Sequence, residues 1–254
     1  MLRTIIADSY RENEKNEIVG ALGTVCNAND NYGWASSGIY CYWDYESREI
    51  LYVGLAIDLT ERFKQHNGMF PGIDLNTCKR REIDEYFRQK ERIGFSVVLQ
   101  SCLSQPATRN VEKRFEGLFT RIPNARDIGA DGKAGIQRLE GVLLEAFKKA
   151  NRTFPKWNKI GGSIKGQLSV KNSNIEAFSL LNATTMHYLL SRSTLREIAA
   201  KATLERYENF LHAARIIAPI VGFEMACQVI ASTDMIGTFN HMVAEGYHEK
   251  VLQL

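Results

Sequence analysis

The chain of 254 residues is 44% hydrophobic, which is enough to bury one large core or two modest ones. Its formal net charge of +3 excludes nucleic-acid binding through overall charge, so such a partner would have to be met by local basic patches. The five cysteines are scattered and lack a Cys-x-x-Cys pair, which argues against a disulfide framework and a structural zinc site. The sequence shows no signal peptide and no uninterrupted apolar span, so we expect a cytoplasmic protein without a membrane partner.

The N-terminal part predicts a short leader and then a β-hairpin. Residues 1–33 are expected to form a leader with one helix. The segments Ser37 to Trp43 and Ile50 to Val53 are rich in β-branched and aromatic residues and predict two strands joined by a polar turn. If Tyr40 pairs with Tyr52, the loop has three residues, and both phenols stand on one face with Cβ atoms roughly 4.5–5.5 Å apart. A glycine lies in or beside each strand, which indicates close approach by another backbone or a ligand.

The next segment carries start and stop signals for a short helix. Asp58 can cap its first turn, and Glu61 stands at the capping-box position. Gly68 can take the left-handed conformation that ends a helix. Arg62 and His66 are then four residues apart and lie on one face of this helix, directly after the hairpin.

The elements that follow complete an α/β domain over residues 34–165. Thr77 to Glu91 predicts a basic helix and Gly94 to Ser101 a third strand, so we expect a three-stranded antiparallel sheet flanked by helices. Residues 68–135 form a basic insertion with a further helix from Val111 to Thr120. Its cations could neutralise backbone phosphates, and the interspersed acids leave open the alternative of solvated helix faces. The residues expected to contact nucleic acid are Lys79, Arg80, Arg81 and Arg114.

The last third of the chain is expected to be helical. A loop rich in Gly, Ser and Lys over residues 161–173 marks the boundary to an α-helical domain over residues 166–254. The segment after Thr194 weakly echoes the first helix of a helix-turn-helix unit. It lacks the glycine turn that often joins such helices, so an ordinary bundle helix is favoured. This domain would serve dimerisation or DNA contact.

The order of the motifs resembles the GIY-YIG nuclease superfamily. Gly38-Ile39-Tyr40, Tyr52-Val53-Gly54, Arg62 and His66 occur in the superfamily's order. Leu143-Leu144-Glu145 and then Pro155-Lys156-Trp157-Asn158 resemble its closing glutamate and asparagine, with Glu140 as the alternative glutamate. The resemblance covers residues 36–162.

This resemblance implies roles for five side chains in phosphodiester hydrolysis. Tyr40 would be the general base for the attacking water, and Tyr52 would orient the water or the phosphate. An ordinary tyrosine pKa of about 10 requires activation, which Arg62 supplies electrostatically while neutral His66 relays the proton. Arg62 would also grip the scissile phosphate in a forked hydrogen bond, and Asn158 would order the site.

The resemblance further implies a metal and a substrate class. Glu145 would hold one Mg²⁺, which Mn²⁺ can replace, since no second acidic cluster indicates a two-metal site. We therefore expect an endonuclease acting on double-stranded DNA, with a restriction-type enzyme favoured and a homodimer suited to symmetric cutting. A mobile-element, repair or phage-defence nuclease is the alternative within the superfamily. A nucleic-acid-binding module without activity is the alternative outside this class of enzyme.

Overall fold

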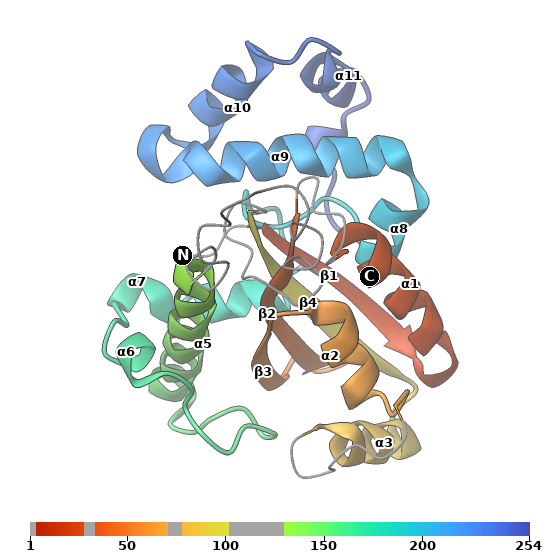
Figure 1. Cartoon of the computed structure of the whole chain (residues 1–254), viewed down its shortest axis with the longest axis vertical. Helices are drawn as coiled ribbons and strands as arrows, with labels where there is room; N and C mark the ends of the chain where they lie inside the picture. Colours follow the sequence, from red (N-terminus) through yellow and green to blue (C-terminus); the bar gives the residue numbers. More distant parts are fainter. Residues whose placement is uncertain (1–3, 28–33, 71–77, 102–129) are drawn as a thin grey trace, which may run out of the picture.

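The sheet at the centre of the protein has four antiparallel strands. The computed structural model describes residues 4–27, 34–70, 78–101 and 130–254. The strands β1 (Thr4–Arg11), β2 (Trp34–Asp44), β3 (Ile50–Ala56) and β4 (Arg92–Ser101) lie in the order β1-β4-β2-β3 (Figure 1). The architecture is thus α/β, as the sequence predicts.

The prediction of three strands was wrong because the N-terminal segment joins the sheet. β1 pairs with β4 along its whole length, from Thr4 opposite Leu99 to Arg11 opposite Arg92. Asp8 and Ser9 are polar but buried, so β1 lacks the usual alternation of buried apolar and exposed polar residues. The strand was therefore not recognised from the sequence. A 3₁₀ turn (Glu12–Glu14) and helix α1 (Lys15–Val25) follow, in place of a purely helical leader.

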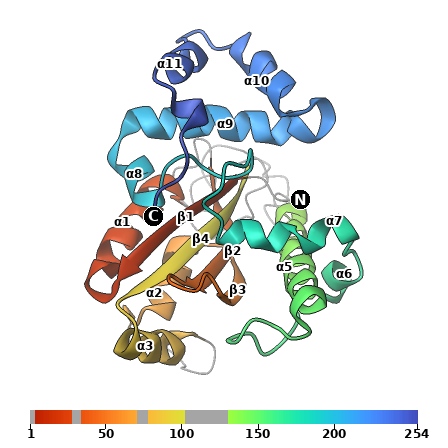
Figure 2. The same ribbon diagram turned by 180° about the vertical axis from the view of Figure 1, so that it is seen from behind.

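Helices cover both faces of the sheet, so that every residue of the central strand β2 is buried. On one face lie α1, α2 (Leu59–His66), α3 (Arg80–Gln89) and α8 (Leu195–Ala200), and their apolar side chains pack on Tyr40 and its neighbours. On the other face, α5 (Ala130–Asn151) and a 3₁₀ helix (Ala177–Leu181) pack against the sheet (Figure 2). The phenols of the hairpin therefore face the side that carries α2 and α3.

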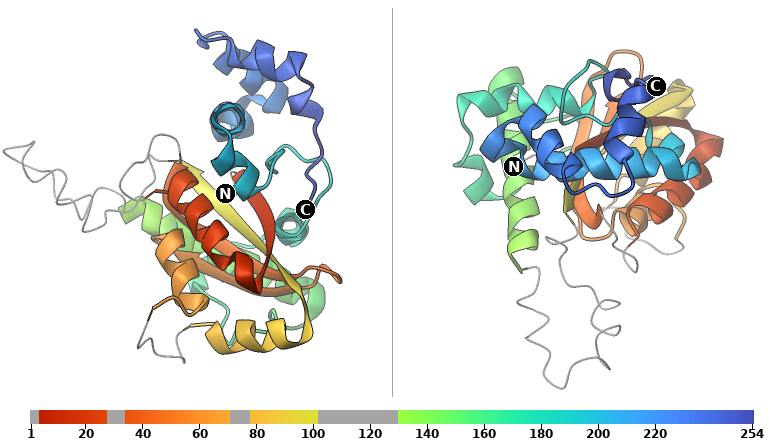
Figure 3. Two further views of the ribbon diagram at one scale, coloured as in Figure 1. Left: turned by 90° about the vertical axis from the view of Figure 1, so that its right-hand side faces the viewer. Right: turned by 90° about the horizontal axis from the view of Figure 1, so that it is seen from above.

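The C-terminal helices form a further layer with a hydrophobic cluster of its own. α9 (Ala202–Val221), α10 (Phe223–Ala231) and α11 (Thr238–Ala244) stack over one end of the sheet (Figure 3), and a 3₁₀ turn (Tyr247–Glu249) follows. By contrast, α6 (Ile164–Gln167) and α7 (Asn172–Ile175) pack on α5. The separate core thus begins at α9, later than the boundary expected near residue 166. No helix in the described ranges is long and apolar enough to cross a membrane.

The hairpin register differs from the predicted one by two residues. Tyr40 lies opposite Gly54 and Tyr42 opposite Tyr52, with an irregularity after Tyr42. The turn is longer than predicted, because the Asp44 carboxylate accepts backbone N–H bonds from residues 46 and 47 and residue 48 takes a left-handed φ of 62°. A shift of two residues keeps every side chain on its face, so Tyr40 and Tyr52 remain neighbours.

The helix predicted after the hairpin is confirmed with its signals. The Asp58 carboxylate accepts a hydrogen bond from the Glu61 N–H at 2.9 Å, and Gly68 has a φ of 73°. The predicted basic helix corresponds to α3 and the predicted third strand to β4. The helix predicted from Val111 to Thr120 lies outside the described residues.

Candidate active site

The two motif tyrosines lie side by side because the motif glycines leave room for them. The ring centroids of Tyr40 and Tyr52 are 5.7 Å apart. A Cβ atom on Gly54 would come within 2.7 Å of the Tyr40 hydroxyl and of a Tyr52 ring carbon, and one on Gly38 would overlap the carbonyl oxygen of Val98. Both glycines are therefore required by close packing, as predicted from their position in the strands.

His66 is held in one tautomer. Its Nδ1 accepts a hydrogen bond from the Lys79 backbone N–H at 2.8 Å, so this nitrogen carries no proton. Burial, with the nearby Arg62 and Lys79 cations, lowers the pKa of His66 to about 3, so the ring is neutral. A neutral imidazole without a proton on Nδ1 carries it on Nε2, which lies 2.6 Å from the Tyr40 hydroxyl. His66 thus donates a hydrogen bond to the Tyr40 oxygen.

The Tyr40 hydroxyl is buried next to Tyr52. Burial and the neighbouring Tyr52 raise the pKa of Tyr40 well above 10, whereas Arg62 lowers it. The contact between the phenols raises the pKa of Tyr40 and lowers that of Tyr52. Because the His66 Nε2–H donates to the Tyr40 oxygen, the proton of Tyr40 points away from His66.

Arg62 supplies the positive charge next to the phenols. It lies on α2 one turn before His66 and is half-buried. Its charge lowers the pKa values of Tyr40, Tyr52 and His66. None of the described residues forms an ion pair with it, so its guanidinium can bind an anion.

The carboxylate beside the phenols belongs to Glu140. Its charge raises the pKa values of Tyr40 and Tyr52, and burial raises its own pKa to about 7. Glu145 lies five residues further along α5, which corresponds to about 140° around the helix axis. Glu140, the alternative glutamate, is thus the carboxylate whose charge acts on both phenols.

Asn158 contacts the strand that carries Tyr52. Its side-chain amide accepts from the Val53 N–H at 2.9 Å and donates to the Val53 carbonyl at 2.8 Å. The Trp157 N–H also donates to the Leu51 carbonyl at 2.8 Å. Asn158 therefore fixes residues 157–158 along the outer edge of β3 and acts on the site through that strand.

Lys79 also lies next to the phenols. In the sequence it was predicted only as one member of a basic patch. Its side chain is mostly buried, with Nζ 3.1 Å from the Glu82 carboxylate and 5.2 Å from the centre of the Tyr52 ring. Its backbone N–H sets the His66 tautomer. A backbone donor carries no signal in the sequence, so this role could be seen only in the folded chain.

The other residues expected to contact nucleic acid are dispersed. The Arg80 Nε lies 3.5 Å from Asp84, and Arg81 is exposed at the rim of a neighbouring cavity. Arg114 lies outside the described residues. The structure therefore describes three of the four residues of the predicted patch.

Glu140 is the carboxylate to be weighed as a ligand for a divalent cation. In the described part of the chain, no three His, Cys, Asp or Glu side chains converge on one point. Burial raises the pKa of Glu140, and a hydrogen bond from the Leu55 N–H lowers it. A hard cation that keeps several waters and takes phosphate oxygens as further ligands would neutralise such a carboxylate.

Comparison with known proteins gives no further guide to function. No family model, curated protein or solved structure matches the chain. The functional conclusion therefore depends on the geometry of the site and on the order of the motifs in the sequence.

Proposed function

We propose that the protein is a Mg²⁺-dependent endonuclease that hydrolyses phosphodiester bonds of DNA. The observation that carries the proposal is the buried Tyr40 hydroxyl, which receives the His66 Nε2–H and feels the charges of both Arg62 and Glu140. Packing alone does not require a tyrosine to lie between a cation and an unpaired carboxylate. It suits a reaction in which a water is deprotonated next to an anionic phosphorus centre.

In this proposal each side chain has a defined task. Tyr40 first gives up its own proton toward Tyr52 and solvent, and the resulting phenolate then takes the proton of the attacking water. The His66 N–H stabilises the negative charge on the phenolate oxygen. Arg62 binds the scissile phosphate and lowers the pKa of Tyr40. Tyr52 contacts Tyr40 and, being half-buried, lies on the route of the proton toward solvent. The relay through His66 expected from the sequence is left out, because its Nε2 already carries a proton.

Glu140 would hold the metal in this proposal. A Mg²⁺ ion bound there supplies positive charge to the phosphate oxygens and the leaving oxygen. Glu140 is preferred to Glu145 because its charge acts on both phenols. Asn158 positions the strand that carries Tyr52.

The test is cleavage of plasmid DNA by the full chain with Mg²⁺ or with EDTA. Tyr40→Phe is expected to abolish cleavage while DNA binding remains. Tyr42→Phe is the matched control, because Tyr42 lies on the same strand and face, and its hydroxyl has Asn67 and Tyr10 as its partners instead of His66. Cleavage by Tyr40→Phe at the wild-type rate would refute the proposal. A protein that binds DNA and never cuts it would favour the alternative of a non-catalytic binding module.

The biological role stays a prediction. A restriction-type enzyme on double-stranded DNA should produce the same termini repeatedly when a genome is digested. Scattered nicks would instead favour repair or phage defence. Sequencing the ends of the products separates these roles.

A further inference from the structure

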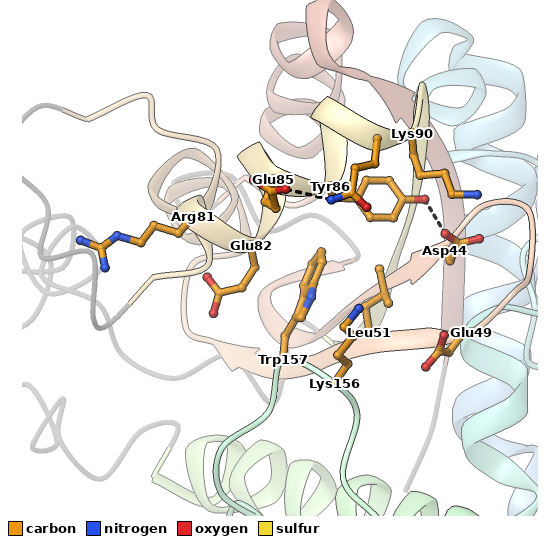
Figure 4. Close-up of a pocket in the computed structure, with 11 residues that line it drawn as sticks. Asp44, Glu49, Leu51, Arg81, Glu82, Glu85, Tyr86, Lys90, Lys156 and Trp157 are labelled. Carbon is orange, nitrogen blue, oxygen red and sulfur yellow. Dashed lines mark hydrogen bonds between the residues drawn. The ribbon is translucent and has the colours of Figure 1, made fainter.

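A cavity of about 480 Å³ lies beside the phenol pair, between α3 and the segment that follows α5 (Figure 4). Leu51, Tyr86 and Trp157 provide its apolar and aromatic surface. Arg81, Glu82 and Lys156 are among the charged residues that line it. Its volume lies within the range of pockets that take small organic groups, which is about 300–1,000 Å³.

The cavity shares a wall with the candidate active site. Leu51 directly precedes Tyr52 in β3. Glu82 binds Lys79, whose ammonium group lies over the Tyr52 ring, and Glu82 also raises the pKa of Tyr52. A strand held at the phenols would therefore pass near the mouth of this cavity.

Trp157 offers a rigid aromatic surface to the cavity. Its backbone N–H is bonded to the Leu51 carbonyl, and the next residue makes two hydrogen bonds with Val53. Its ring is in edge-on contact with Tyr86, at a centroid distance of 6.2 Å and an interplanar angle of 83°. The side chain is half-buried, so part of the indole remains open to the cavity. Aromatic rings of this kind stack with nucleobases of any sequence.

Two exposed cations at the rim can meet a nucleotide backbone. Lys90 is paired with Glu46, Glu82 with Lys79, and Glu85 with Arg88. Among the described residues, Arg81 and Lys156 line the cavity without an ion-pair partner, as do Asp44 and Glu49, so the two cations are available although these four charges sum to zero. Arg81 comes from α3 and Lys156 from the opposite side (Figure 4). Both are exposed, so they can contact phosphates while a base occupies the apolar interior.

We infer that this cavity binds a single nucleobase of the bound strand, stacked on Trp157, with the adjoining phosphates at Arg81 and Lys156. The inference rests on the proposed function, because it places the base next to the cleaved bond. A base that stacks on Trp157 inside the cavity is either unpaired or turned out of the duplex.

Photochemical cross-linking of the wild-type chain tests the inference without a variant. A single-stranded oligonucleotide with 5-iodouracil is bound in EDTA, irradiated, and the modified peptides are identified by mass spectrometry. Attachment at Trp157 or Tyr86 is expected. Attachment confined to peptides outside the cavity would overturn the inference.

Tryptophan fluorescence provides a second measurement. The chain has three tryptophans, and Trp34 and Trp43 are 3% and 0% exposed, so a base in the cavity should quench Trp157. Trp157→Phe should remove the quenching and retain the packing, and Trp157→Ala should weaken binding about 5- to 150-fold. Unchanged quenching in Trp157→Phe would contradict the inference.

The salt dependence of binding tests the rim. Replacing Arg81 and Lys156 together by Gln should reduce the slope of log K against log[salt] by about 1.4 for single strands. Lys149→Gln is the control, since Lys149 is exposed at the end of α5 and does not line the cavity. An unchanged slope in the double variant would show that the phosphates bind elsewhere.

These results are separable from those of the proposed function. Wild-type cleavage with normal binding by Trp157→Ala would refute the nucleobase site and leave the nuclease intact. Quenching and cross-linking at Trp157 without any cleavage would support the nucleobase site and refute the nuclease.

Discussion

Glu140 gives the sharpest test of the proposed site, because its negative charge should lower the free energy of unfolding. Burial raises its pKa from 4.5 to about 7, so the folded protein binds this proton more tightly than the unfolded chain does. The free energy of unfolding should therefore fall as the pH rises from 4.5 to 7. The pKa difference corresponds to about 3 kcal/mol. Glu140→Gln should raise the free energy of unfolding by up to this amount at pH 8 and change it little at pH 4.5.

The same substitution should remove the response to metal. Mg²⁺ at 100 times its dissociation constant should stabilise the wild-type protein by about 2.7 kcal/mol. Glu140→Gln should show neither this stabilisation nor cleavage. Urea unfolding at pH 5 and pH 8, with Mg²⁺ or EDTA, measures both effects, and the plasmid assay measures cleavage.

Glu145→Gln is the matched control. It makes the same chemical change on the same helix, about 140° away around its axis. It should leave the pH dependence, the response to Mg²⁺ and cleavage unchanged. If Glu145→Gln abolished cleavage, or if Glu140→Gln were less stable than wild type at pH 8, the assignment of Glu140 would be refuted.

Three further predictions concern the neighbouring residues. Gly54→Ala should lower the unfolding free energy by about 1–3 kcal/mol and abolish cleavage, because the new methyl group overlaps both phenols. Gly20→Ala in α1, which has open space around it, should instead raise the unfolding free energy by about 0.5–1 kcal/mol. Equal stability of the two variants in urea would contradict the packing described at Gly54. The His66 pKa of about 3 lies below the value of 6.5 for an unfolded chain, so stability should fall as the pH drops from 6.5 toward 3, and the His66 ring signal in NMR should not titrate between pH 5 and pH 8. A midpoint near pH 6.5 for that signal would show that the ring is not held as described. Arg62→Lys keeps the charge and loses the forked donor, so cleavage should fall about 10²-fold or more while the urea midpoint stays constant; Lys64→Arg on the same helix should alter neither, and full activity of Arg62→Lys would rule out a forked contact.

The local parts of the fold could be predicted from the sequence, because their signals lie close together in the chain. The cap at Asp58, the end of the helix at Gly68 and the close packing at the motif glycines were all readable in this way. β1 was missed for the opposite reason. Its buried Asp8 is compensated by Arg196, which lies 188 positions away in the chain.

The candidate site could be predicted in its composition but not in every assignment. The helix that carries both glutamates is apolar on a broad face, so its periodicity did not decide between Glu140 and Glu145. The tautomer of His66 depends on a backbone N–H thirteen positions away, and no residue type encodes such a donor. The hairpin register depended on a turn closed by the Asp44 side chain.

The buried Arg215 makes the C-terminal helices inseparable from the sheet. Its guanidinium donates to the carbonyls of Tyr188 and Leu190 and pairs with Glu208 at 3.0 Å, and both charged side chains are fully buried. It also reaches the Thr4 hydroxyl at the first residue of β1. A chain truncated before α9 would leave the carbonyls of Tyr188 and Leu190 without this donor. The loss in unfolding free energy should therefore be larger than the loss of the helices' own core. Removal of the C-terminal helices should therefore destabilise the residues next to β1 as well as remove their own core.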